Sequence, residues 1–171
     1  MMQFYALPIG LATGLLFGYL WLRTTPLDDP GLFFNLWYFL LFFVPIIVVH
    51  EFIHAAGYPM AGRSNETVVG CWPSKGVFYA HYLGELTRNR MLTVFLLPIG
   101  VMSVLPLLAA MIFRLEVEWL AFVSTWNAVL ACGDLLGAGL IVTQVPSAAI
   151  VRNQGWFTYW RRRGMSARQS S

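Results

Sequence analysis

The segment His50-Glu51-Phe52-Ile53-His54 places two imidazoles and a carboxylate in a stretch that is otherwise without charge. Residues four apart lie on one face of a helix, so His50 and His54 can both direct a ring nitrogen at a single ion. Glu51 is rotated by about 100° from His50, which lets it reach a water on that ion without binding the ion itself. The spacing predicts two zinc ligands and a general base.

A catalytic zinc takes three protein ligands and leaves one position open, so a third ligand is required. Besides Glu51, Asp134 is the only acidic residue within the long hydrophobic runs. Its short side chain requires close approach of two helices, which small residues permit. We expect that approach to be made by small residues on both helices: Gly133, Gly137 and Gly139 on one side, and Ala55, Ala56 and Gly57 on the other.

We therefore predict one zinc ion per chain, held by His50, His54 and Asp134. The rival third ligands are loop residues: His81, Glu66 and Glu85. Two imidazoles and a carboxylate suit zinc, and the same set also binds iron or manganese.

Asn127 lies seven residues before Asp134, two helical turns away and so on the same face. An amide there can contact the substrate backbone or a developing oxyanion, or it can form a hydrogen bond between helices, and the residues alone leave both open. Cys132, two positions from Asp134, faces away and is interpreted as a packing residue.

Composition places these residues in a membrane. Of the 171 residues, 58% are hydrophobic and 11% charged, whereas soluble domains are about 45–50% apolar and about 25% charged. A soluble enzyme and a disordered chain are excluded, and two cysteines cannot build a disulfide framework. Polar groups inside a membrane are costly and mark functional sites, so a purely structural histidine pair is disfavoured.

Four hydrophobic runs are long enough to cross a bilayer. We expect one all-α membrane domain over residues 1–171, with helices at about 4–22, 32–56, 91–113 and 118–143. The connection Gly57–Arg90 has turn-forming glycine and proline residues around two apolar stretches, which predicts a small hairpin or a membrane-skimming loop. Residues 152–171 form a tail.

The basic residues flank the hydrophobic runs, which is typical of residues that orient a chain in the membrane and not of a nucleic-acid-binding surface. An even number of spans places both termini and the long loop on the same side of the membrane. Nine basic residues then lie on that side: Arg63, Lys75, Arg88, Arg90, Arg152, Arg161, Arg162, Arg163 and Arg168. Only Arg23 and Arg114 lie opposite. The positive-inside rule then places both termini and the histidine end of the second helix in the cytoplasm.

The tail segment Trp156–Arg163 mixes four aromatic residues with three consecutive arginines. This composition suits the headgroup zone of a bilayer that contains anionic lipid, so we expect a membrane anchor. Organelle signals are absent, and we expect a prokaryotic plasma membrane.

These motifs resemble those of two related groups of proteins. The metal-site pattern resembles the site-2 protease clan of intramembrane zinc proteases, on these residues: His50-Glu51-x-x-His54, Asn127 and Gly133-Asp134. The shorter layout is similar to the putative zincin peptidases of the DUF3267 type, with Thr87-Arg88-Asn89-Arg90 leading into a helix with Pro98. Together the motifs span about half of the chain, from His50 to Gly137.

The resemblance implies roles for five residues. His50, His54 and Asp134 would hold zinc, Glu51 would activate water, and Asn127 would contact substrate. The chain departs from the clan in having Cys132-Gly133-Asp134-Leu135 where Leu-Asp-Gly is usual, and in lacking a proline between Asn127 and Asp134.

We expect a zinc-dependent intramembrane endopeptidase that hydrolyses peptide bonds of a transmembrane or membrane-associated protein. The alternative is a non-catalytic membrane protein of the same fold that binds partner helices. The presence of Glu51 favours the enzyme, because a binding protein has no need of a general base. A metal transporter would spread its polar residues along a path, and three histidines are too few for a diiron oxygenase.

Overall fold

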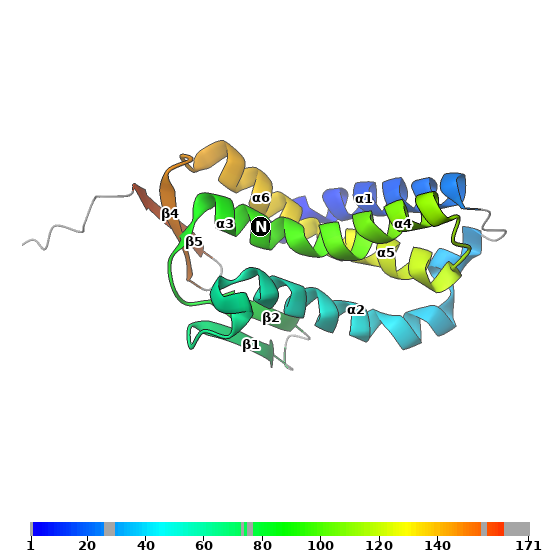
Figure 1. Cartoon of the computed structure of the whole chain (residues 1–171), viewed down its shortest axis with the longest axis horizontal. Helices are drawn as coiled ribbons and strands as arrows, with labels where there is room; N and C mark the ends of the chain where they lie inside the picture. The colour runs from blue at the N-terminus through cyan, green and yellow to red at the C-terminus, as the bar shows by residue number, and fades with distance from the viewer. Residues whose placement is uncertain (1, 26–29, 73, 75–76, 155–156, 163–171) are drawn as a thin grey trace, which may run out of the picture.

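The hydrophobic runs fold as helices, and the more polar connections between them carry short strands. The structure is a computed structural model that describes residues 2–25, 30–72, 74, 77–154 and 157–162. Its helices lie side by side in an elongated bundle, and two small sheets lie at one end of it (Figure 1).

Six α-helices make up the bundle: α1 (Met2–Thr24), α2 (Leu36–Gly57), α3 (Arg88–Ile99), α4 (Leu105–Phe113), α5 (Glu118–Leu130) and α6 (Cys132–Gln144). Within the described residues, three helical stretches are long and apolar enough to cross a membrane, and a fourth is added if α5 and α6 count as one bent span. The expected set of about four membrane helices therefore holds by length and composition.

Side-chain caps fix where α2 and α3 begin. The Asn35 carboxamide accepts hydrogen bonds from the backbone N–H groups of Trp37 and Tyr38, and the Thr87 hydroxyl accepts one from Arg90. Both caps satisfy backbone donors that a helix start leaves without partners. Residues Pro30–Phe34 form a separate 3-10 turn, so the second membrane helix starts four residues later than its expected start at 32.

Two of the expected helices are interrupted. The span 91–113 contains a π-helical turn, Gly100–Val104, between α3 and α4. Pro98 and Pro106 flank this turn, and each removes one N–H from the helical ladder. The span expected at 118–143 bends by 47° between α5 and α6, where Ala131 leaves the helical conformation with ψ of 5°.

The expectation of an all-α fold is wrong, because the structure contains two sheets. In the first, β1 (Thr67–Trp72) pairs antiparallel with β2 (Val77–Tyr82). This is the hairpin expected between the second and third membrane helices. The second sheet has the order β3 (Leu86–Thr87), β4 (Ala149–Gln154), β5 (Phe157–Arg162).

The described residues of the tail belong to the strand pair β4 and β5. Pro146 follows the end of α6 and cannot continue a helix, and in β4 Ala149 and Val151 are buried against the bundle. Phe157, Tyr159 and Trp160 of β5 are exposed, and their expected role as an anchor stays a prediction. Trp156, Arg163 and the rest of the tail to residue 171 lie outside the described residues.

Two buried clusters meet along α2. One contains Ile46 together with Trp21 and Phe122 from α1 and α5. The other contains Ala55 and includes residues of α3, α6 and both sheets. His50 and His54 lie in the stretch of α2 where one cluster gives way to the other.

Candidate metal centre

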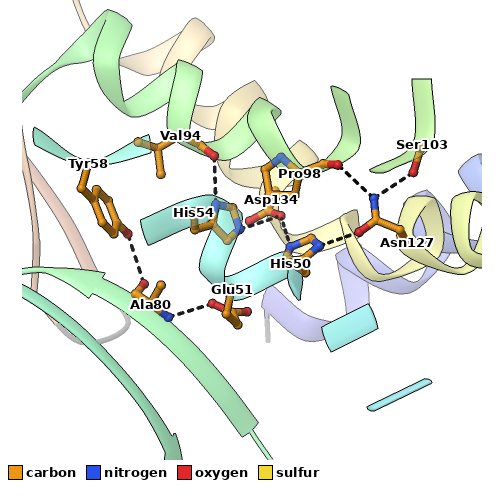
Figure 2. Close-up of polar contacts among 10 residues, drawn as sticks. All are labelled: His50, Glu51, His54, Tyr58, Ala80, Val94, Pro98, Ser103, Asn127 and Asp134. Carbon is orange, nitrogen blue, oxygen red and sulfur yellow. Dashed lines mark hydrogen bonds and ion pairs between the residues drawn. The ribbon is translucent and has the colours of Figure 1, made fainter. Parts of the chain in front are cut away.

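Helices α2 and α6 bring three metal-ligand side chains to one point. The Nε2 atoms of His50 and His54 lie 2.9 and 3.2 Å from the same Asp134 oxygen, Oδ2. One ligand atom from each of the three residues lies within 4.8 Å of the others. Both imidazoles are buried and the carboxylate is partly buried. Figure 2 shows the two rings and the carboxylate turned toward one another.

The bend between α5 and α6 places Asp134. The residue lies in the first turn of α6, just after the bend, where a helix N-terminus favours a negative charge. The α6 glycines expected to permit close approach do not lie against α2. A Cβ on Gly133 or Gly139 would meet nothing within 4 Å, and one on Gly137 would meet the Phe95 ring of α3.

Close packing occurs instead on the other side of the bend, against α1. A Cβ on Gly10 would lie 3.0 Å from the Val129 carbonyl oxygen and 3.2 Å from Cβ of Cys132. The missing side chain at Gly10 therefore lets α1 lie directly behind the bend. Cys132 faces α1 and not the metal ligands, in agreement with the packing role expected for it.

The second nitrogen of each imidazole is bonded within the protein. His54 Nδ1 lies 2.9 Å from the Val94 carbonyl oxygen, and His50 Nδ1 lies 2.8 Å from Oδ1 of Asn127. A carbonyl only accepts, so the His54 hydrogen is on Nδ1 and its Nε2 carries a lone pair. Backbone and amide partners of this kind orient histidine ligands in metal sites.

The lone pair on His54 tests whether a metal fits. Nε2 of the neutral ring faces Asp134 Oδ2, which also carries only lone pairs, and two acceptors this close repel unless a proton or a metal ion lies between them. Two imidazole nitrogens and one carboxylate are also the ligand set of a catalytic zinc with one open position. The residues present therefore fit a zinc ion.

Glu51 projects from α2 toward the hairpin and does not join this group. Its Oε2 accepts a hydrogen bond from the backbone N–H of Ala80 on β2, at 2.7 Å. The Tyr58 hydroxyl donates to the Ala80 carbonyl, at 3.1 Å, and the Tyr58 ring stacks on Tyr82. Both backbone groups of Ala80 are thus turned toward α2 and bonded to its side chains, as Figure 2 shows.

Asn127 is fully buried next to His50. Its Oδ1 faces His50, and its Nδ2 donates to the Pro98 carbonyl at 3.1 Å and to Oγ of Ser103 at 2.8 Å. Both ends of the amide are therefore engaged inside the protein. Of the two expectations for Asn127, this geometry favours the hydrogen bond between helices.

The rival third ligands have other surroundings. Glu66 accepts a hydrogen bond from the Tyr82 hydroxyl, Glu85 pairs with Arg161, and His81 lies opposite Val68 in the hairpin. Among the described residues, none of the three belongs to a group spaced to hold a metal. Asp134 is the carboxylate that the structure brings to both histidines.

Two arginines at the start of α3 hold the ends of the helices that carry the site. Arg90 donates to the Tyr58 carbonyl at the end of α2, at 3.0 Å. Arg88 donates to the carbonyls of Ile141 and Val142 in the last turn of α6. From the sequence, these arginines are interpreted as orientation signals and as part of a family motif, and their contacts with the helix ends are not predicted, although a basic residue beside a helix C-terminus is a known stabilising arrangement.

Comparison with known proteins gives one family match. The sequence profile of a family described as putative zincin peptidase matches residues 31–150, which is 120 of the 171 residues. The match includes the three candidate ligands, Glu51 and the hairpin, and leaves α1 and β5 outside. No curated protein and no solved structure matches the chain.

Proposed function

This chain belongs to the putative zincin peptidase family, and from that premise we propose that it is a zinc-dependent endopeptidase that cuts membrane proteins within the bilayer. The observation that carries the proposal is the meeting of His50, His54 and Asp134 around one point, with Glu51 one residue from a ligand. An acidic base beside a two-histidine, one-carboxylate site is the arrangement of a metallopeptidase.

The proposed reaction is hydrolysis of a peptide bond. A zinc ion in such a site supplies a Lewis acid, which polarises a carbonyl and lowers the pKa of a bound water toward about 7. Glu51 takes one proton from the attacking water as the water oxygen bonds to the carbonyl carbon. The carboxyl group of Glu51 then delivers that proton to the peptide nitrogen as the C–N bond breaks.

We place the reaction near one face of the membrane. His50 and His54 lie in the C-terminal turns of α2, a 22-residue helix that is long and apolar enough to cross a membrane. The excess of basic residues on the side of the long loop makes that end the cytoplasmic one. The substrate would be a transmembrane or membrane-associated protein whose helix unwinds there.

The hairpin is our candidate for receiving that substrate. Strand β2 lies against Glu51 through Ala80, and an unwound peptide can add to a sheet edge by backbone hydrogen bonds. Deleting the hairpin should abolish cleavage while zinc stays bound, because no hairpin residue is a proposed ligand. Cleavage that is unchanged by the deletion would rule out this role.

Metal content measured by mass spectrometry on the detergent-purified protein tests the proposal. We expect about one zinc per chain in the wild type and in Glu51→Gln, and little in His50→Ala or Asp134→Ala, because three ligands are needed for tight binding. Absence of metal from the folded wild type would contradict the enzyme and favour a non-catalytic protein that binds partner helices.

A further inference from the structure

A chain of buried hydrogen bonds runs behind His50 and joins four segments of the bundle. Trp21 Nε1 of α1 donates to Ser124 Oγ of α5, at 2.9 Å. Ser124 and Ser103 then exchange hydroxyl-to-carbonyl hydrogen bonds of 3.0 and 2.8 Å. Asn127 donates to the Ser103 hydroxyl and contacts His50 with its oxygen. All five residues are buried, and each of these hydrogen bonds connects two different helical segments.

This series of hydrogen bonds allows only one orientation of the Asn127 amide. The Pro98 carbonyl can only accept, and the Ser103 hydroxyl has its single hydrogen committed to the Ser124 carbonyl. Both groups must therefore receive hydrogens from Nδ2 of Asn127. Rotating the amide by 180° would put two acceptor oxygens 3.1 Å apart at Pro98, so Oδ1 is the atom that faces His50.

The orientation of the amide in turn bears on which nitrogen of His50 carries the hydrogen. Both ring nitrogens of His50 face acceptors, Nδ1 the Asn127 Oδ1 at 2.8 Å and Nε2 the Asp134 Oδ2 at 2.9 Å. A metal ion bound at Nε2 would leave the single hydrogen of the neutral imidazole on Nδ1, donated to Asn127. Val94 imposes the same tautomer on His54, so both rings present the atom that a metal needs.

The π-helical turn Gly100–Val104 explains how Ser103 comes to this position. A π turn inserts an extra residue into the helical ladder and is often found at functional sites. Here it sits between Pro98 and α4, and both Pro98 and Ser103 bond the Asn127 nitrogen. The interruption in the third span thus supplies the two acceptors that fix the amide.

We propose that Asn127 is a positioning residue, which fixes the tautomer and the ring orientation of His50 for metal binding, and that it does not contact substrate. The inference rests on the proposed function in one respect, namely that His50 is a zinc ligand. It departs from the substrate contact that resemblance to the site-2 protease clan implies. The reason is that Asn127 is 0% exposed and both ends of its amide are already bonded.

Zinc affinity of Asn127→Leu, measured by competition with a chelating dye, tests the proposal. Loss of a partner that orients a metal ligand weakens binding by about 10- to 100-fold, and we expect that range here. Thr125→Val is the matched control, since Thr125 lies on the same helix and its buried hydroxyl has no partner within the described residues. Its affinity should equal that of the wild type.

Ser103→Ala is a second, milder variant in case Asn127→Leu fails to fold. It removes one of the two acceptors of the Asn127 amide and leaves the Pro98 carbonyl in place. We expect a smaller loss of zinc affinity in the same direction. An affinity unchanged in both variants would overturn the proposal.

Nitrogen NMR of the three histidines, recorded with and without zinc, reads the tautomer directly. We expect His50 to carry its hydrogen on Nδ1 in the wild type and in Thr125→Val, and to lose this preference in Asn127→Leu. The same tautomer in Asn127→Leu would overturn the positioning role. A wild type that binds no zinc, yet shows this difference in tautomer, would contradict the zinc peptidase and leave the positioning role supported.

Discussion

At the scale of single residues, α2 separates the ligands from the base by the direction each side chain takes. His50 and His54 face Asp134 on α6, and Glu51 faces Ala80 on β2. Because neighbouring positions on a helix differ by about 100°, one turn serves both purposes. The carboxylate of Glu51 is thereby kept apart from the candidate metal ligands and is bonded to the hairpin instead.

Replacing Glu51 by glutamine removes the base but keeps the shape of the side chain. An amide cannot take a proton from water, so we expect proteolysis to fall by about 100- to 10,000-fold while zinc content stays the same. Membrane-protein fragments would be compared by mass spectrometry in cells that express each variant. Glu116→Gln, an exposed carboxylate in the loop between α4 and α5, is the control and should release the same fragments as the wild type.

The residues that do chemistry could be predicted because their side chains are distinctive. His50, His54 and Asp134 are rare polar types in an apolar sequence, and the structure brings them together. The groups that orient them are mostly backbone atoms, such as the Val94 and Pro98 carbonyls. Every residue has such a carbonyl, so the sequence carries no signal for them.

At the scale of elements, interruptions decide the geometry of the site. The span 88–113 is long and apolar enough to cross a membrane despite its π turn, so hydropathy indicates the length of the span but not the position of its break. The bend at Ala131 involves no proline and arises in the folded packing against α1. Sequence analysis therefore found the spans but missed both the bend that places Asp134 and the turn that places Ser103.

The contacts made by Arg90 predict a dependence of the site on the start of α3. Arg90→Met removes the cation that bonds the carbonyl of Tyr58, the residue that follows α2, an interaction worth about 1 kcal/mol. We expect the melting temperature in detergent to fall and zinc binding to weaken, because the end of α2 becomes less fixed. Arg63→Met, an exposed arginine on the loop after α2, should change neither; equal effects of the two substitutions would contradict a specific clamp.

At the scale of the whole molecule, both sheets lie toward the same end of the helical bundle (Figure 1). The pair of Glu85 and Arg161 connects the loop after the hairpin to the last described strand. Two nitrogen-to-oxygen contacts of 3.1 and 2.8 Å join the guanidinium and the carboxylate. This pair ties the C-terminal strand pair to the segment that leads into α3.

Acid should loosen this connection. Hydrogen bonds from Arg161 lower the pKa of Glu85 below its ordinary value of 4.5 in the folded protein. A lowered folded pKa means that the pair stabilises the fold above pH 4.5, and that this contribution is lost as the pH falls through the folded pKa. We expect a fluorine NMR signal from labelled Trp160 to shift over that acidic range.

Glu85→Gln is the control for this titration, because an amide has no proton to gain there. The Trp160 signal of this variant should show no transition of its own below pH 4.5. A transition of equal size in the variant and the wild type would show that another group is responsible.

The contacts of Ala80 give the proposed protease a form of latency. An incoming peptide strand would offer an acceptor for the N–H of Ala80 and a donor for its carbonyl. In the structure, Glu51 is that acceptor and the Tyr58 hydroxyl is that donor. The enzyme thus holds its own recognition edge with its general base. A helical segment, whose backbone groups are already satisfied, competes poorly for that edge, whereas a segment that has lost its helical hydrogen bonds displaces Glu51 and frees it for catalysis. Intact membrane helices would then be spared, and the cue for cleavage would be local unwinding of the target.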